Sequence, residues 1–212
     1  MAAIKKSALL IAAGEISENI FKKVFSKKKL CIAIDGGYNY CIDSGFIPDV
    51  VIGDFDSLDY SLINEEIISI HQESQEETDL SKAINWTLSK GIKDIEIIGV
   101  ESGRSDHILG AYAALAELNQ EKMTTINLQV HLNDFLVTYI PKNKVFEFNF
   151  PKKTHLSLFC LSDSIVSLKG VEWELERENM GFSTRGIHNY SKEQSVEFLI
   201  HSGGPALFFN HR

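Results

Sequence analysis

The chain has 212 residues, of which 44% are hydrophobic and 24% are charged, and its formal net charge at pH 7 is -8. This composition is typical of a folded globular protein with one large or two small domains, and it argues against intrinsic disorder. The acidic balance argues against binding to nucleic acid or to an anionic membrane through bulk charge. No apolar stretch approaches the ~20 residues that span a bilayer, so no membrane partner is expected.

The cysteines, Cys31, Cys41 and Cys160, are odd in number and far apart. Their spacing matches neither C-x-x-C nor a zinc-ligand pattern, so neither a disulfide framework nor structural zinc is expected. The N-terminal sequence MAAIKKSALLIAAGE imitates a signal peptide, but its apolar run of about seven residues is at the short limit for one. We therefore expect a cytoplasmic protein whose first apolar run is a buried strand.

Short apolar runs that end at glycine alternate with helical patterns over the first 120 residues. The expected strands are ALLIAAG, LCIAIDGG, DVVIGD and DIEIIGV, and the expected helices are SENIFKKVFSKK and residues 78–91 and 106–118. Continuous β-branched runs are typical of parallel strands that are covered on both faces. This part therefore predicts an α/β domain, Rossmann-like and three-layered, with a mostly parallel sheet.

From about residue 125 the hydrophobic period changes from that of a helix to that of a strand. KVFEFNF places Phe146, Phe148 and Phe150 on one face, HLSLFCL repeats the alternation, and SVEFLIHSGGPALFFN is typical of two strands around a turn. A separate all-β unit is expected, a sandwich or a partial barrel, with the sandwich preferred. Because strand-like segments also precede it, the boundary is soft; we place the domains at residues 1–135 and 136–212.

Acidic residues lie where the predicted parallel strands end, the edge at which such sheets bind ligands. Asp54 and Asp56 are two residues apart, so their side chains point to the same side of an extended segment. They would raise each other's pKa unless a cation lies between them, and hard carboxylate oxygens favour Mg²⁺ or Mn²⁺ over zinc. Since bound Mg²⁺ usually keeps phosphate oxygens as ligands, a phosphorylated ligand is expected.

Neighbouring loops support a phosphate site, although each feature has a plainer interpretation. The aspartate pair alone could form a polar turn, and the glycine-rich turn at 35–37 could be no more than a turn. Arg104 suits a phosphate oxygen but could pair with Glu101, and His107 could be a capping or packing residue. Trp173 alternates with glutamates, which is typical of a core residue in a β-domain. The helix that begins near Thr78 adds N–H groups that favour an anion.

Several motifs together resemble those of the thiamin pyrophosphokinase family in order and approximate spacing. They are DGG at 35–37, PDVVIGDFDS at 48–57, TDL at 78–80 and GRSDH at 103–107, followed by KGVEWEL and by GFSTRGIHN at 181–189. Each motif alone is weak, but the combination is specific and spans nearly the whole chain. The resemblance implies transfer of pyrophosphate from ATP to the thiamin hydroxyl, giving thiamin diphosphate and AMP. It also implies an ATP- and Mg²⁺-binding α/β domain, a β-sandwich, and a homodimer with thiamin sites between subunits.

The resemblance also implies site residues, motif by motif. The implied catalytic residues are Asp54, Asp56, Asp79, Arg104 and Asp106, of which Asp54, Asp56 and Asp79 would hold Mg²⁺. The implied ATP-binding residues are Asp35, Gly36, Gly37, Thr78, Arg104 and His107. The implied thiamin-binding residues are Gln75, Trp173, Ser183 and Asn189, with Trp173 stacked on the pyrimidine. The chain departs from the family pattern at Glu76, where an aspartate is common, and at His188, where a serine is common.

Two alternatives remain open from the sequence. The strand that ends in DFDS also resembles the nucleophile motif of haloacid-dehalogenase-type phosphohydrolases, in which the first aspartate is phosphorylated. That class requires a later lysine and a downstream acidic pair; we do not find that acidic pair, and a β-rich C-terminal domain is not expected in this class. A non-catalytic nucleotide or thiamin sensor is the third possibility, and the number of carboxylates argues against it.

Overall fold

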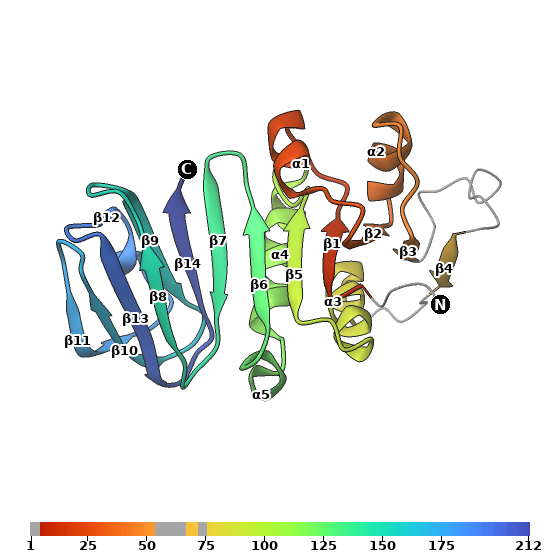
Figure 1. The fold of residues 1–212 in the computed structure, drawn as a ribbon. Helices are drawn as coiled ribbons and strands as arrows, with labels where there is room; N and C mark the ends of the chain where they lie inside the picture. The colour runs from red at the N-terminus through yellow and green to blue at the C-terminus, as the bar shows by residue number, and fades with distance from the viewer. Residues whose placement is uncertain (1–4, 54–66, 72–75) are drawn as a thin grey trace. The chain divides into compact units, whose positions relative to one another are not determined.

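The computed structural model describes residues 5–53, 67–71 and 76–212, and the chain divides into two compact units (Figure 1). Unit 1 consists of Met1–Leu118 and Val130–Asn133, and unit 2 of Asn119–Gln129 and Asp134–Arg212. The division falls within β6 (Asn127–His131), and the short helices α5 (Gln120–Met123) and η2 (Thr184–Gly186) belong to unit 2. No helix in the described ranges is long and apolar enough to cross a bilayer.

Unit 1 is built on parallel strands whose hydrogen-bonded order is β5-β1-β2-β3-β4. Their bounds are β1 (Ser7–Ile11), β2 (Leu30–Ile34), β3 (Val50–Gly53), β4 (Ile68–His71) and β5 (Asp94–Ile98). The inner strands are almost fully buried, as expected for a parallel sheet with helices on both faces. The predicted mostly parallel α/β class is confirmed.

Helices cover both faces of the sheet in unit 1 (Figure 1). The helices α1 (Glu18–Val24) and α2 (Gly37–Asp43) share a core cluster with Ile98 of β5. Ile97, the residue before Ile98, faces the opposite side of the sheet. It lines a small void with residues of α3 (Asp79–Ser89) and α4 (Ser105–Ala116). Because neighbouring strand residues point to opposite faces, this pair of contacts establishes the three-layer arrangement.

Two elements of unit 1 were not predicted. Helix α2 begins directly after Gly36, which offers no side-chain cap, so the usual start signal is missing. Strand β4 is a short edge strand with mostly exposed residues, and it lacks the apolar run of a buried parallel strand. The strand predicted at 94–100 is therefore the fifth of the described strands and not the fourth.

Asp49, from the PDVVIGDFDS motif, has a structural role at the opposite end of the strands. Lys5 Nζ donates to both carboxylate oxygens at 2.7 Å, and the Cys31 backbone N–H donates to Oδ2 at 2.8 Å. Burial raises the pKa of the Cys31 thiol to about 11, so it stays protonated at neutral pH. All three cysteines are free and buried.

Unit 2 contains two antiparallel sheets that enclose one core. The strand orders are β12-β9-β14-β7 and β11-β10-β13-β8. The bounds are β7 (Phe135–Ile140), β8 (Val145–Asn149), β9 (His155–Cys160), β10 (Ser164–Lys169), β11 (Leu175–Met180), β12 (Asn189–Tyr190), β13 (Ser195–Ser202) and β14 (Ala206–His211). Phe146, Phe148 and Phe150 pack together against the core, as their alternation predicted. The predicted sandwich is confirmed.

Candidate functional site

The turn at residues 35–37 lies across the carboxyl ends of three neighbouring strands. The Asp35 N–H donates to the Ile52 carbonyl oxygen of β3 at 2.9 Å. A Cβ added at Gly37 would lie 2.0 Å from the Ile11 carbonyl oxygen of β1, so only glycine fits there. A Cβ added at Gly53, the last residue of β3, would lie 3.2 Å from the Asp35 Cβ. The end of β3 therefore lies beside Asp35, and Asp54 and Asp56, which follow it, are outside the described residues.

The start of α3 carries the next predicted residues. Thr78 caps the helix, since its Oγ1 accepts a hydrogen bond from the Ser81 N–H at 3.3 Å. Asp79 Oδ1 accepts a hydrogen bond from Lys82 Nζ at 2.9 Å, and the Lys82 side chain is only 6% exposed. The sequence interpretation missed this buried ammonium group, although the i, i+3 spacing of the pair was a usable signal. The pair places a buried ammonium group in the first turn of α3.

Arg104 pairs with Asp106 and not with Glu101. Arg104 Nε donates to Asp106 Oδ1 at 3.1 Å and Nη2 donates to Oδ2 at 2.6 Å, and both side chains are exposed. The hydrogen bonds from Arg104 lower the pKa of the Asp106 carboxyl group, so it stays ionised and is a weak base. His107, in the first turn of α4, is also exposed, which excludes the packing role considered for it.

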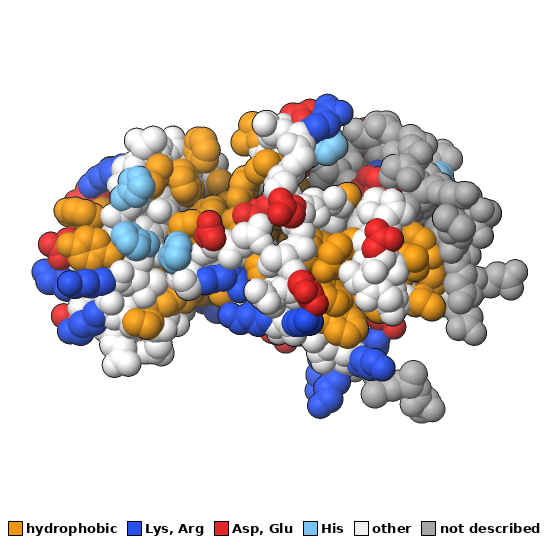
Figure 2. Space-filling model, turned by 90° about the horizontal axis from the view of Figure 1, so that it is seen from above, with side chains coloured by type: hydrophobic (Ala, Val, Ile, Leu, Met, Phe, Trp, Pro, Cys, Tyr) orange, Lys and Arg blue, Asp and Glu red, His pale blue; other side chains and the backbone are white. Residues whose placement is uncertain are grey.

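The described residues contain one part of the predicted metal site. No three His, Cys, Asp or Glu side chains within residues 5–53, 67–71 and 76–212 lie close enough together to hold a metal ion. Asp79 offers a partly exposed carboxylate, a hard oxygen donor that fits Mg²⁺. Figure 2 looks onto this end of the strands, where acidic side chains gather over the end of β5. The predicted magnesium site therefore depends on Asp54 and Asp56 completing the donor set.

Unit 2 carries a separate pocket of about 680 Å³. Its lining combines aliphatic, aromatic and charged side chains: Leu158, Leu168, Glu172, Trp173, Glu174, Leu175, Arg185, Gly186, Ile187, His188 and Asn189. Trp173 and Asn189 were predicted to bind thiamin. Ser183 caps η2 next to the pocket, since its Oγ accepts a hydrogen bond from the Arg185 N–H at 3.4 Å. Gln75, the remaining predicted residue, lies outside the described residues.

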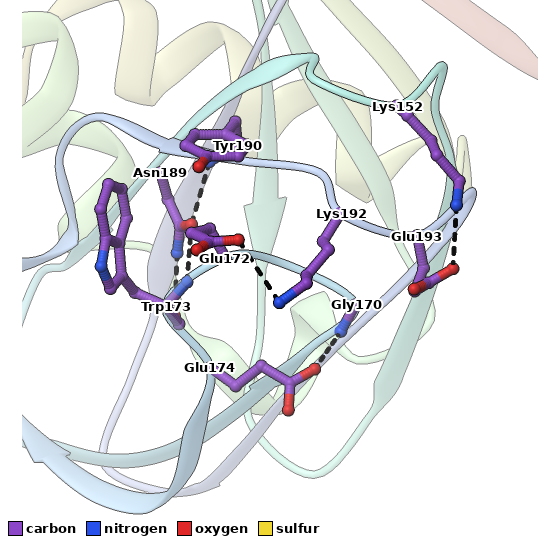
Figure 3. A network of polar contacts seen from close by, with 9 residues as sticks. All are labelled: Lys152, Gly170, Glu172, Trp173, Glu174, Asn189, Tyr190, Lys192 and Glu193. Atoms are coloured by element: carbon purple, nitrogen blue, oxygen red, sulfur yellow. Dashed lines mark hydrogen bonds and ion pairs between the residues drawn. The ribbon is translucent and has the colours of Figure 1, made fainter.

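Trp173 is presented at the surface by Asn189 (Figure 3). The Trp173 backbone N–H donates to Asn189 Oδ1 at 3.2 Å, and Asn189 Nδ2 donates to the Trp173 backbone carbonyl oxygen at 2.9 Å. Asn189 is buried, whereas Trp173 is 59% exposed and packs edge-on against Tyr190, with ring centroids 5.6 Å apart. The interpretation of Trp173 as a core residue is therefore wrong, and the polar atoms of Asn189 hold the backbone on which the indole stands.

From the sequence, Glu172 and Glu174 were interpreted only as the polar positions of an alternating strand pattern around Trp173. Both line the pocket: Glu172 lies 3.5 Å from Lys192 Nζ, and Glu174 Oε1 accepts a hydrogen bond from the Gly170 N–H at 2.8 Å (Figure 3). His188, at the position that departs from the family pattern, also lines it, with a left-handed φ of 64°. An exposed indole beside carboxylates suits a flat, cationic ligand.

An Asn189→Ala variant is expected to disorder the Trp173 loop. Loss of its side-chain hydrogen bonds from a buried position should cost about 1–3 kcal/mol in the free energy of unfolding. If Trp173 binds the acceptor substrate, KM for that substrate should rise about tenfold while KM for the nucleotide stays unchanged. Urea unfolding and two-substrate kinetics test both effects. The exposed Asn179 of β11 provides a control, Asn179→Ala, which should change neither quantity, and equal changes in the two variants would contradict this role of Asn189.

The predicted residues form two groups, one in each unit. The nucleotide-side residues Asp35, Gly36, Gly37, Thr78, Asp79, Arg104, Asp106 and His107 belong to unit 1, and Trp173, Ser183 and Asn189 belong to unit 2. Within unit 1 the structure brings Asp35 beside the end of β3, and it pairs Arg104 with Asp106. Within unit 2 it joins Trp173 to Asn189 directly.

The chain is similar to several known proteins in sequence and in fold. Residues 21–127 match the family model described as "Thiamin pyrophosphokinase, catalytic domain". The thiamine pyrophosphokinase of Bacillus subtilis is 30% identical over 189 residues, which cover 84% of this chain and 82% of that protein. Thiamin pyrophosphokinase 1 of Caenorhabditis elegans is 25% identical over 205 residues, which cover 91% and 82%.

Solved structures extend the similarity to the whole fold. The crystal structure of the Bacillus subtilis enzyme superimposes with a TM-score of 0.79 at 23% identity, and the match covers 97% of this chain and 99% of that chain. The Candida albicans thiamin pyrophosphokinase superimposes with a TM-score of 0.76 at 17% identity, covering 98% and 89%. The fold of these solved structures therefore includes both units of the chain.

Proposed function

Because the chain belongs to the thiamin pyrophosphokinase family, we propose that it is a thiamine diphosphokinase, an enzyme that transfers pyrophosphate from ATP to the hydroxyl group of thiamin. The products are thiamin diphosphate and AMP. The observation that carries the proposal is the pocket of unit 2, in which an exposed Trp173 stands beside two glutamates. Thiamin is a cationic aromatic molecule, and an indole face with nearby carboxylates is suited to such a ligand.

On the nucleotide side, the residues of unit 1 would bind and orient the triphosphate. The turn at 35–37 offers backbone at the carboxyl ends of β1, β2 and β3, and the start of α3 offers helix N–H groups. Arg104 would turn from Asp106 to phosphate oxygens, for which its planar fork is suited. Asp79, with Asp54 and Asp56, would hold Mg²⁺, which neutralises phosphate charge when bound.

The reaction forms a bond between the thiamin hydroxyl oxygen and the β-phosphorus, and it breaks the bond from that phosphorus to the oxygen that leaves with AMP. Such transfers depend mainly on positioning and on charge neutralisation. The hydroxyl proton must pass to a base or to solvent. The lowered pKa of Asp106 makes it a weak acceptor while it is paired with Arg104.

We further propose a homodimer in which each thiamin site lies between subunits, with Trp173 supplied by the partner chain. Neither nucleic acid nor a membrane is proposed as a partner, and the proposed location is the cytoplasm. Residues 1–135 would form the catalytic domain and residues 136–212 the thiamin-binding and dimerisation domain.

Incubation with Mg–ATP and thiamin is expected to yield AMP and thiamin diphosphate in equal amounts. Chelation of Mg²⁺ with EDTA should reduce the rate by at least about 100-fold, and added Mg²⁺ should restore it, because the triphosphate charge would otherwise repel the acceptor oxygen. Chromatographic measurement of both products tests the proposal. Phosphate release without thiamin would instead support the phosphohydrolase alternative, and binding of either substrate without turnover would support the sensor.

A further inference from the structure

The loops that follow β1 and β5 are joined backbone to backbone beyond the end of the sheet. The hydrogen bonds run from Ala12 N–H to the Ile98 oxygen at 2.9 Å, from Gly14 N–H to the Gly99 oxygen at 2.7 Å, and from Glu15 N–H to the Glu101 oxygen at 2.8 Å. A Cβ added at Gly14 would lie 2.3 Å from the Glu101 carbonyl oxygen, so the two backbones are in direct contact. The two loops therefore form one connected structure at the carboxyl ends of the strands.

One side-chain hydrogen bond fixes the part of the β5 loop that leads into α4. Ser102 Oγ donates to Glu15 Oε2 at 2.8 Å, across 87 positions of sequence. Ser102 has a left-handed φ of 63°, and Gly103 follows with 82°. A left-handed conformation is unfavourable for serine, so an interaction that holds the residue there has a direct effect on the path of the loop. Arg104 is the next residue and occupies the N-cap position of α4, without a capping hydrogen bond from its side chain.

The side chain of Arg104 is not held by packing. It is 73% exposed, and its partner Asp106 is also on the surface. The direction of its guanidinium group therefore depends on the backbone of residues 102–104 and on the hydrogen bonds to Asp106. Glu101 adds a second restraint, since its carboxylate accepts a hydrogen bond from the Asn133 N–H after β6.

We propose that Glu15 is a positioning residue for Arg104. Its carboxylate holds Ser102 in the left-handed conformation and so directs the guanidinium group toward the phosphates of the nucleotide. The inference rests on the proposed function, in which Arg104 contacts those phosphates, and Glu15 itself touches no substrate. An exposed hydrogen bond contributes little to global stability, so the consequence of its loss should be seen in nucleotide binding and turnover.

The test is a double-mutant cycle between Glu15→Ala and Arg104→Ala. Glu15→Ala should lower kcat/KM for ATP about tenfold, whereas Glu15→Gln, which keeps an acceptor oxygen for Ser102, should stay within about twofold of the parent. In the Arg104→Ala background, Glu15→Ala should change kcat/KM by less than about twofold, because the positioned group is absent. Ser102→Ala should lower kcat/KM for ATP by the same factor as Glu15→Ala. Glu18→Ala, an exposed glutamate of α1, is the matched control and should have no effect.

The same cycle measured as Mg–ATP binding by calorimetry, without thiamin, separates this inference from the proposed function. Weaker binding in Glu15→Ala, dependent on Arg104, supports the inference even if the chain does not transfer pyrophosphate to thiamin. Additive effects of the two substitutions overturn the inference while leaving the transferase in place. An equal loss in Glu15→Gln, or a lowered unfolding midpoint in Glu15→Ala that accounts for the loss, also overturns it. A parent protein that neither binds Mg–ATP nor forms AMP overturns both.

Discussion

An Asp79→Asn variant is expected to lose the proposed pyrophosphate transfer by about 100- to 1,000-fold, since the amide would replace a proposed charged oxygen donor for Mg²⁺. The same change removes the carboxylate partner of Lys82, whose ammonium group is buried. Because Asp79 is partly exposed, the cost in the free energy of unfolding should be about 1–3 kcal/mol, below that of a fully buried pair. Steady-state kinetics and urea unfolding measure the two effects separately.

The double variant Asp79→Asn, Lys82→Met distinguishes a catalytic role of Asp79 from a structural one. Removing both charges should restore most of the lost stability, because the buried ammonium group is removed together with the Asp79 carboxylate. Activity should stay low if Asp79 is a metal ligand. Lys82→Met alone keeps the carboxylate and should retain at least about a tenth of the parent activity. Recovery of activity in the double variant would show that Asp79 acts only through Lys82.

Gly37→Ala is expected to be among the most destabilising single changes in the chain. The new Cβ would lie 2.0 Å from the Ile11 carbonyl oxygen, and neither the end of β1 nor the start of α2 can move away cheaply. Forced contacts of this kind lower the free energy of unfolding by about 3 kcal/mol or more. The urea midpoint should fall accordingly with an unchanged denaturant slope, which would attribute the change to the native state.

The matched control is Gly110→Ala, the same substitution in the interior of α4. A Cβ there meets no atom within 4 Å, so the helix gains propensity without a clash. The variant should be more stable by about 0.5–1 kcal/mol. The two substitutions are expected to change the free energy of unfolding in opposite directions. Equal destabilisation in both would contradict the close approach at Gly37.

The sequence was sufficient for most of the architecture. β-Branched runs that end at glycine predicted the inner parallel strands, and the change of period after residue 125 predicted the sandwich. The structure departs from the prediction at β4 and α2, which lack a buried run and a side-chain cap. Hydrophobic periodicity in a sequence arises where one face of an element packs against the core. An exposed edge strand such as β4 therefore shows little hydrophobic pattern.

The candidate site was only partly accessible from sequence. The family resemblance selected Asp79, Arg104 and Trp173, and it selected Asp54 and Asp56, directly after β3, as metal ligands. The roles of all five residues remain predictions. Spacing could not show that Asn189 supports the backbone of Trp173, or that Glu15 contacts Ser102. These contacts join residues that are distant in sequence, and they depend on which strands lie side by side.

By itself, then, the sequence determined the class of the fold, the family and the residue types available for chemistry, because these follow from local periodicity and from short motifs. Only the tertiary structure decided why Gly37 must be glycine, which atoms hold Asp79 and Trp173, and how Glu15 and Ser102 join the loops after β1 and β5. The physical reason is that strand register and loop path bring together groups that no local pattern relates. The same register that buries the core thus places the polar groups at the ends of the strands.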